Sequence, residues 1–95
     1  MQLHQLNQHT YSETIEETWQ HSLQKGDSLV LVEEAILRTI HQKKLLKSLI
    51  EKQGISLYYL QADAQAYGLT PDIGSALDDA QWVDITLCAD SNISW

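Results

Sequence analysis

Cys88 is the only side chain in this sequence that could carry out thiol chemistry, because the chain holds a single cysteine. A reactive thiolate needs a helix N-terminus or a nearby cation to stabilise its charge. Cys88 instead lies toward the end of a predicted helix, where the helix dipole is negative, and between Asp84 and Asp90. We therefore expect a small buried hydrophobic residue, and sulfur transfer through Cys88 is the alternative.

Metal, phosphate and acid–base chemistry find little support in the other polar residues. Zinc sites need three or four convergent ligands, and the histidines show no paired spacing with carboxylates or cysteine. Phosphate sites need clustered glycines, whereas the four glycines here are isolated. The adjacent acids Asp78 and Asp79 point in different directions, and helix capping explains at least one of them. We predict no catalytic residue, metal site or cofactor. The histidines are His4, His9, His21 and His41.

His4 is the least certain of these assignments. It falls inside a short predicted strand, where a buried imidazole costs free energy unless it is hydrogen-bonded.

Two strand-to-helix units position the polar residues of this chain. Parallel sheets place any working surface just past their strand ends. The first unit leads there to Glu33 and Glu34, and the second leads to Asp63. Neither leads to a nucleophile. The fold class predicted for residues 1–95 is a single α/β domain with a mostly parallel sheet of about four strands flanked by helices. The predicted strands are Gln2–Leu6, Leu29–Val32, Ile55–Leu60 and the brief edge strand Ile73–Leu77.

Local signals predict where the helices begin and end. Ser12 could cap a first helix that Gly26 stops, and Thr70–Asp72 resembles a helix start with proline at the first position. A half-turn shift in the apolar pattern predicts a break near His41–Gln42, followed by a helix that ends at Gly54. Asp78 or Asp79 is expected to cap the last helix, and the tail Ser91–Trp95 shows no obvious regular structure.

Charge and composition limit the classes of function. The formal net charge is −7, and no basic residue occurs from Ile55 to Trp95, which argues against a free-standing nucleic-acid binder. A remaining hypothesis is an RNA-contacting patch made by Arg38, Lys43, Lys44 and Lys47. No run of apolar residues is long enough to span a membrane, and no export signal is visible. We expect a cytoplasmic protein.

The tryptophans divide into core and surface candidates. Trp19 and Trp82 lie in helical apolar stripes and are expected to pack in the core. Trp95 follows a polar tail that gives it no local reason to be buried, so we expect it to dock against another surface.

The chain resembles the TusB/DsrH family of sulfur-relay subunits along nearly its whole length. The resemblance rests on Leu3–Leu6, on Gly26–Glu33 and on the closing Ser94-Trp95, with further pieces at Tyr59-Leu60, Asp63, Gly68-Leu69, Leu77-Asp78 and Trp82-Val83. The sequence departs from the family pattern at two positions. Ala35 stands where the family often has glycine, so a more helical turn is expected here. Tyr67 stands where a basic residue is common.

The resemblance implies a DsrE-like fold and assembly with TusC-like and TusD-like subunits into a hetero-oligomer. Sulfur would arrive from a TusA-like donor and leave through a TusE-like acceptor toward 2-thiolation of the tRNA wobble uridine. The TusD-like subunit carries the sulfur-accepting cysteine, which this chain lacks at its strand ends. We expect a non-catalytic subunit, with Asp63, Tyr67 and Trp95 at the subunit interface. A DsrH-like subunit of a dissimilatory sulfur-oxidation complex is the alternative, although the cysteine that such members can carry in the first helix region is absent here.

Overall fold

A five-stranded parallel sheet forms the centre of the structure, a computed structural model that describes all 95 residues. The strand order is β4-β3-β2-β1-β5, and every neighbouring pair is parallel. The α/β prediction is confirmed, with one strand more than the four expected. The strands are β1 (Gln2–Leu6), β2 (Ser28–Leu31), β3 (Ser56–Leu60), β4 (Ser75–Leu77) and β5 (Ser91–Ser94).

The additional strand is β5, and the expectation of an irregular tail is therefore wrong. Ile93 lies opposite His4 in the β1–β5 register, and the backbone N–H of Trp95 donates to the Gln5 carbonyl at 3.0 Å. Only Ile93 in this strand is a large apolar residue, so the segment carries too little alternation to be recognised as a strand. Pairing with β1 supplies the hydrogen bonds that local sequence does not specify.

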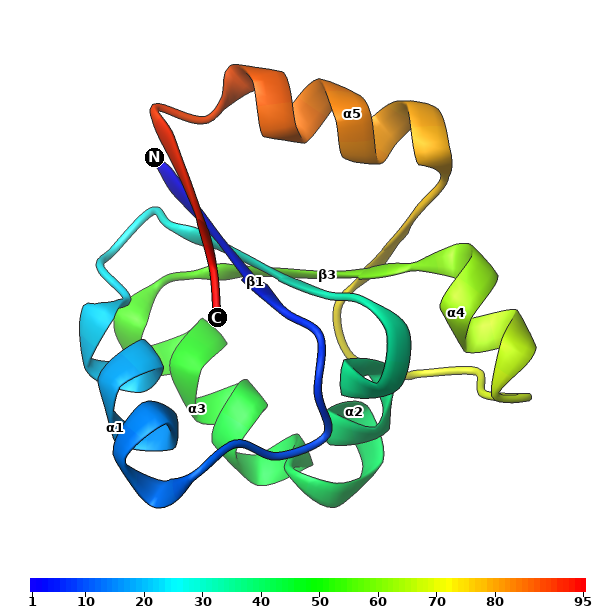
Figure 1. Cartoon of the computed structure of the whole chain (residues 1–95), viewed down its shortest axis with the longest axis horizontal. Helices are drawn as coiled ribbons and strands as arrows, with labels where there is room; N and C mark the ends of the chain where they lie inside the picture. The colour runs from blue at the N-terminus through cyan, green and yellow to red at the C-terminus, as the bar shows by residue number, and fades with distance from the viewer.

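The helices cover the two faces of the sheet unequally (Figure 1). One face carries helices α1 (Glu13–Ser22), α2 (Arg38–His41) and α3 (Lys43–Gln53), with a 3-10 turn, η1 (Glu33–Leu37), leading into α2. The other face carries only α5 (Asp79–Cys88), while the short helix α4 (Gln61–Ala66) continues directly from the end of β3. None of these helices is long and apolar enough to cross a membrane.

Most predicted helix boundaries are confirmed. Gln42 interrupts the helical region between α2 and α3, and Gly54 ends α3 in the left-handed conformation at φ 70°. Asp78 caps α5 in a capping box with Gln81, in which each side chain accepts a hydrogen bond from the other residue's backbone. The turn after β2 is helical, as expected from Ala35.

Two boundary predictions are wrong. Thr70–Asp72 starts no helix and lies instead in the irregular connection before β4. Helix α1 ends at Ser22 with an extended Leu23, so Gly26, at φ 87°, belongs to the turn before β2 and does not stop the helix.

The hydrophobic core is correspondingly divided between the two faces. The larger cluster lies between the sheet and the α1–α3 layer and contains the fully buried Trp19. The smaller cluster lies under α5, where Trp82 and Ile85 are only half-buried against the sheet. A single helix therefore covers one whole face. The buried members of this smaller cluster are Leu3, Val30, Val32, Leu60 and Leu77.

Candidate functional site

At the carboxyl end of the sheet, where the sequence analysis placed Glu33, Glu34 and Asp63, hydrogen bonds within the chain join the ends of β1, β2 and β3. The Asp63 carboxylate accepts from the backbone N–H of Glu33 at 2.6 Å. Glu33 is the only residue other than glycine with a positive φ, at 52°, a conformation that costs about 1 kcal/mol or more for a residue with a Cβ. Asp63 therefore holds a strained turn in place and joins the ends of β2 and β3.

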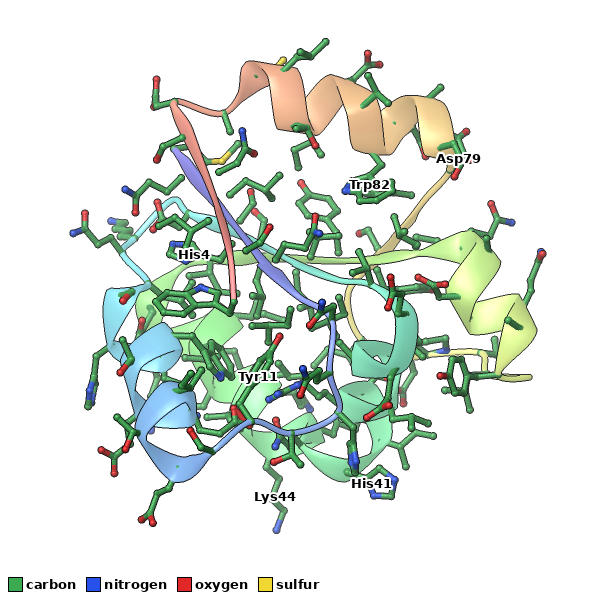
Figure 2. All side chains as sticks on the ribbon, viewed as in Figure 1. His4, Tyr11, His41, Lys44, Asp79 and Trp82 are labelled. Atoms are coloured by element: carbon green, nitrogen blue, oxygen red, sulfur yellow. The ribbon has the colours of Figure 1, made fainter.

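The next strand end is joined to this one in the same way. The Glu34 carboxylate accepts from the backbone N–H of His9 at 3.1 Å, which links the segment after β1 to the segment after β2. The rings of His9 and His41 lie 4.7 Å apart beside this contact, and Figure 2 shows His41 on the outer side of the helical layer. No group of three or more His, Cys, Asp or Glu side chains is placed to hold a metal ion.

The point where the strand order reverses, between β1 and β5, is also filled from within. In open α/β sheets this reversal is the usual ligand crevice. Here the Tyr11 hydroxyl lies 3.1 Å from the main-chain oxygen of Trp95 and accepts from the backbone N–H of Asn7 at 2.9 Å. The contact between the Tyr11 hydroxyl and the Trp95 main-chain oxygen therefore joins the ends of β1 and β5.

Trp95 is half-buried against its own domain. Its indole packs against the larger core, and its ring is stacked with the imidazole of His4 at 6.3 Å between centroids. These contacts partly bury Trp95, which the sequence did not indicate. Its assignment to a subunit interface remains a prediction for the part of the ring left exposed.

His4 is fully buried and, as the sequence analysis required, hydrogen-bonded on both sides of its ring. Its Nδ1 accepts from the Trp95 indole N–H at 3.3 Å, and its Nε2 lies 3.2 Å from Asp27 Oδ2. An indole N–H can only donate, so Nδ1 carries no proton and the hydrogen resides on Nε2, where it is donated to Asp27. His4 is therefore neutral in this arrangement, with both of its nitrogens used.

Asp27 completes this buried group. Burial by itself raises its pKa, but the carboxylate accepts from the backbone N–H groups of Gln2 and Gln24 and from His4, and together these hold the pKa below its ordinary value. Asp27 is thus an ionised anchor for β1 and the turn before β2.

Cys88 is exposed, so the expectation that it would be buried is wrong. It is the last residue of α5, and β5 begins three residues later at Ser91, which pairs with Gln2 at the start of β1. Cys88 therefore lies toward the amino end of the sheet, opposite to the end that carries Glu33 and Asp63. Its place in the last helical turn is as predicted, and a helix C-terminus does not stabilise a thiolate.

Tyr67, directly after α4, is exposed and precedes Gly68, which lines an open groove. The tyrosine retains 45% of its accessible surface, and Ile40, which lines the groove, retains 55%. Lys43 and Asp72 bridge the groove at 2.6 Å, and this contact lowers the pKa of Asp72. The groove has a volume of about 370 Å³ and is open to solvent. Its lining residues are Thr39, Ile40, Lys43, Gly68, Leu69, Thr70, Pro71 and Asp72.

Arg38 is not part of a surface patch, so the predicted basic patch of Arg38, Lys43, Lys44 and Lys47 is reduced to its lysines. Arg38 is fully buried, where its guanidinium binds the Glu16 carboxylate at 2.8 Å and lies over the rings of Tyr11 and Trp19. Burial raises the pKa of Glu16, but hydrogen bonds from Arg38 and Trp19 outweigh it and lower the pKa overall. Lys44 and Lys47 remain exposed on α3, with Lys43 partly exposed (Figure 2 labels Lys44). Only an ordinary charged helix surface is left of the patch.

Sequence reasoning missed the partners of His4, Asp27 and Arg38 because they lie far apart along the chain. His4 and Trp95 are 91 residues apart, and Arg38 and Glu16 are 22 apart. The one signal available was the position of His4 inside a strand.

Together these features define a class: a small parallel α/β domain whose strand ends are joined by internal hydrogen bonds and carry no cysteine. Residues 9–92 match the sequence model of the family described as DsrH like protein, and the chain belongs to this family. The resemblance to the TusB/DsrH family is thereby confirmed, and the chain is, in general terms, a sulfur-relay subunit. A search of curated proteins found no match.

Proposed function

We propose that this chain is a non-catalytic subunit of a TusBCD-like sulfurtransferase complex that relays persulfide sulfur for 2-thiolation of the tRNA wobble uridine. In this proposal it works in the cytoplasm with TusC-like and TusD-like subunits, and the complex receives sulfur from a TusA-like donor and passes it to a TusE-like acceptor.

The observation that carries the proposal is the set of internal hydrogen bonds that join strand ends at the carboxyl end of the sheet. Asp63, Glu34 and Tyr11 use their polar groups to join neighbouring strand ends. A persulfide carrier needs a thiol with room and a stabilising charge at this end, and the only thiol lies at the opposite end. This favours a role in shaping and stabilising a neighbouring subunit that holds the sulfur.

Exposed apolar residues near these strand ends support contact with such a neighbour. Ile40 lines the groove and the exposed Tyr67 directly precedes its lining residue Gly68, and aromatic and large apolar side chains are typical of interfaces. We propose that this groove receives side chains of the sulfur-bearing subunit.

Co-expression with the TusC-like and TusD-like subunits of the same source tests assembly. We expect a complex that stays together in size-exclusion chromatography, and a chain that elutes alone contradicts the proposal. Ile40→Asp with Tyr67→Asp should weaken assembly, whereas Gln65→Glu, on the exposed side of the same helix α4, should not.

Sulfur transfer through Cys88 is a second candidate function because the thiol is exposed. Mass spectrometry of the complex after incubation with a persulfide donor distinguishes the two. We expect added sulfur on the TusD-like subunit and none on Cys88, and full transfer activity with Cys88→Ser. Loss of activity in that variant would make Cys88 the carrier.

Measuring the product distinguishes a role in sulfur oxidation from a role in tRNA thiolation. Wobble-uridine thiolation is measured in tRNA from cells lacking this chain. Unchanged thiolation would leave the sulfur-oxidation alternative.

A further inference from the structure

Helix α5 has the composition of a helix covered on both sides, although only one of its sides is covered in this domain. Trp82 and Ile85 point to the sheet, and Figure 2 shows Trp82 beneath the helix. At the helical repeat of 100° per residue, Ala80, Val83 and Leu87 fall on the opposite side. Val83 keeps 54% and Leu87 keeps 77% of its accessible surface. A helix that is apolar on both sides is normally buried on both sides.

The charges around this outer face decide what can cover it. Asp79 and Asp84 are exposed beside the apolar residues, and α5 contains no lysine, arginine or histidine. Packing α5 against α5 of a second copy would bring these carboxylates together without a cation, which is unfavourable. The occupant must therefore bring positive charge as well as an apolar centre.

We propose that the outer face of α5 is a second subunit interface, which binds a helix of a different subunit that presents apolar residues flanked by lysine or arginine. This rests on the proposed function, since it assigns one more neighbour in the same complex. The face lies on the opposite side of the sheet from the α1–α3 layer, so it is distinct from the groove beside Tyr67 (Figure 1). One chain could thus contact two different subunits.

The test uses the complex with the TusC-like and TusD-like subunits and variants of the exposed side chains. Val83→Ser with Leu87→Ser should weaken association by at least tenfold, and Asp84→Lys should weaken it several-fold. Ile15→Ser is the matched control, because Ile15 is 41% exposed on α1 at the other face of the sheet, and it should leave association unchanged. Raising the salt concentration from about 0.1 to 1 M should also weaken the wild-type complex, because it shortens the screening length from about 10 to 3 Å.

Cys88 provides an independent readout on the same helix. As the only cysteine, and an exposed one, it can be followed in this chain by peptide mass spectrometry after maleimide alkylation. Its alkylation should slow at least several-fold when the partner subunits are bound, and the Val83→Ser/Leu87→Ser variant should restore the free rate.

The outcomes separate this inference from the proposed function. Wild-type assembly together with normal assembly of the Val83/Leu87 variant and unprotected Cys88 overturns the inference alone. Absence of any wild-type assembly overturns both. Self-association of the isolated chain that Leu87→Ser abolishes would make a second copy the occupant and overturn the proposed hetero-subunit contact.

Discussion

Replacing His4 with phenylalanine tests the buried group that ties the last strand to the first. The ring keeps a similar shape but loses the donor to Asp27 and the acceptor for the Trp95 indole N–H. A hydrogen bond to a charged group contributes about 1.5–3 kcal/mol, and a neutral one contributes about 0.5–1.5 kcal/mol. Asp27 keeps two backbone donors, from Gln2 and Gln24, so the lower part of the first range applies. We expect a loss of about 2–4 kcal/mol in the free energy of unfolding.

Urea denaturation followed by far-ultraviolet circular dichroism measures this loss. With a slope of about 1–1.5 kcal/mol per molar urea, the midpoint should fall by about 2 M. Trp95→Phe removes the indole N–H donor and part of the ring's packing, but leaves the bond between His4 and Asp27, and should cost about 1–2 kcal/mol. His21→Phe, at an exposed position of α1, is the matched control and should stay within about 0.5 kcal/mol of wild type. A His4→Phe variant as stable as that control would refute the assignment of both hydrogen bonds.

Three further predictions concern the other buried or strained polar groups. Asp63→Ala leaves the turn at Glu33 without its acceptor and should cost about 1 kcal/mol in urea denaturation, with a new protease cut near Glu33 as a second readout. Because the pKa of Asp27 is lowered in the folded state, its ionised carboxylate contributes fully to the free energy of unfolding above the unfolded-state pKa of about 3.9. This contribution is lost as the pH falls below that value. Asp27→Asn should therefore show a smaller drop in urea midpoint between pH 6 and pH 3 than the wild type does. Arg38→Met leaves Glu16 unpaired in a largely buried site and should lower the free energy of unfolding by about 3 kcal/mol, and restoration by the added change Glu16→Leu would confirm that the unpaired charge is the cause.

The joined strand ends and the two exposed apolar regions lead to a common interpretation. Asp63, Glu34 and Tyr11 already use their hydrogen-bonding groups within the chain, while Ile40 at the groove and Val83 and Leu87 on the outer face of α5 remain exposed. A subunit that acts by contact rather than by its own chemistry needs this combination. The proposed division of labour with a sulfur-bearing subunit follows from it.

Local sequence determined a large part of the architecture. The unbroken apolar run of β2, the left-handed Gly54 and the Asp78 cap specify their own conformations over a few residues. Consecutive strand–helix units then favour a parallel sheet, because parallel neighbours require a crossover connection. The absence of a cysteine near the strand ends could likewise be read directly from the sequence.

Tertiary structure decided the features that depend on distant partners. Strand β5 exists because β1 offers it a free edge, and His4 is buried neutral because Trp95 and Asp27 meet it from opposite ends of the chain. Arg38 is internal and Cys88 external because of how whole helices pack, which their immediate neighbours do not reveal. Each of these depends on contacts between residues far apart in the sequence, and such contacts form only when the complete sheet assembles.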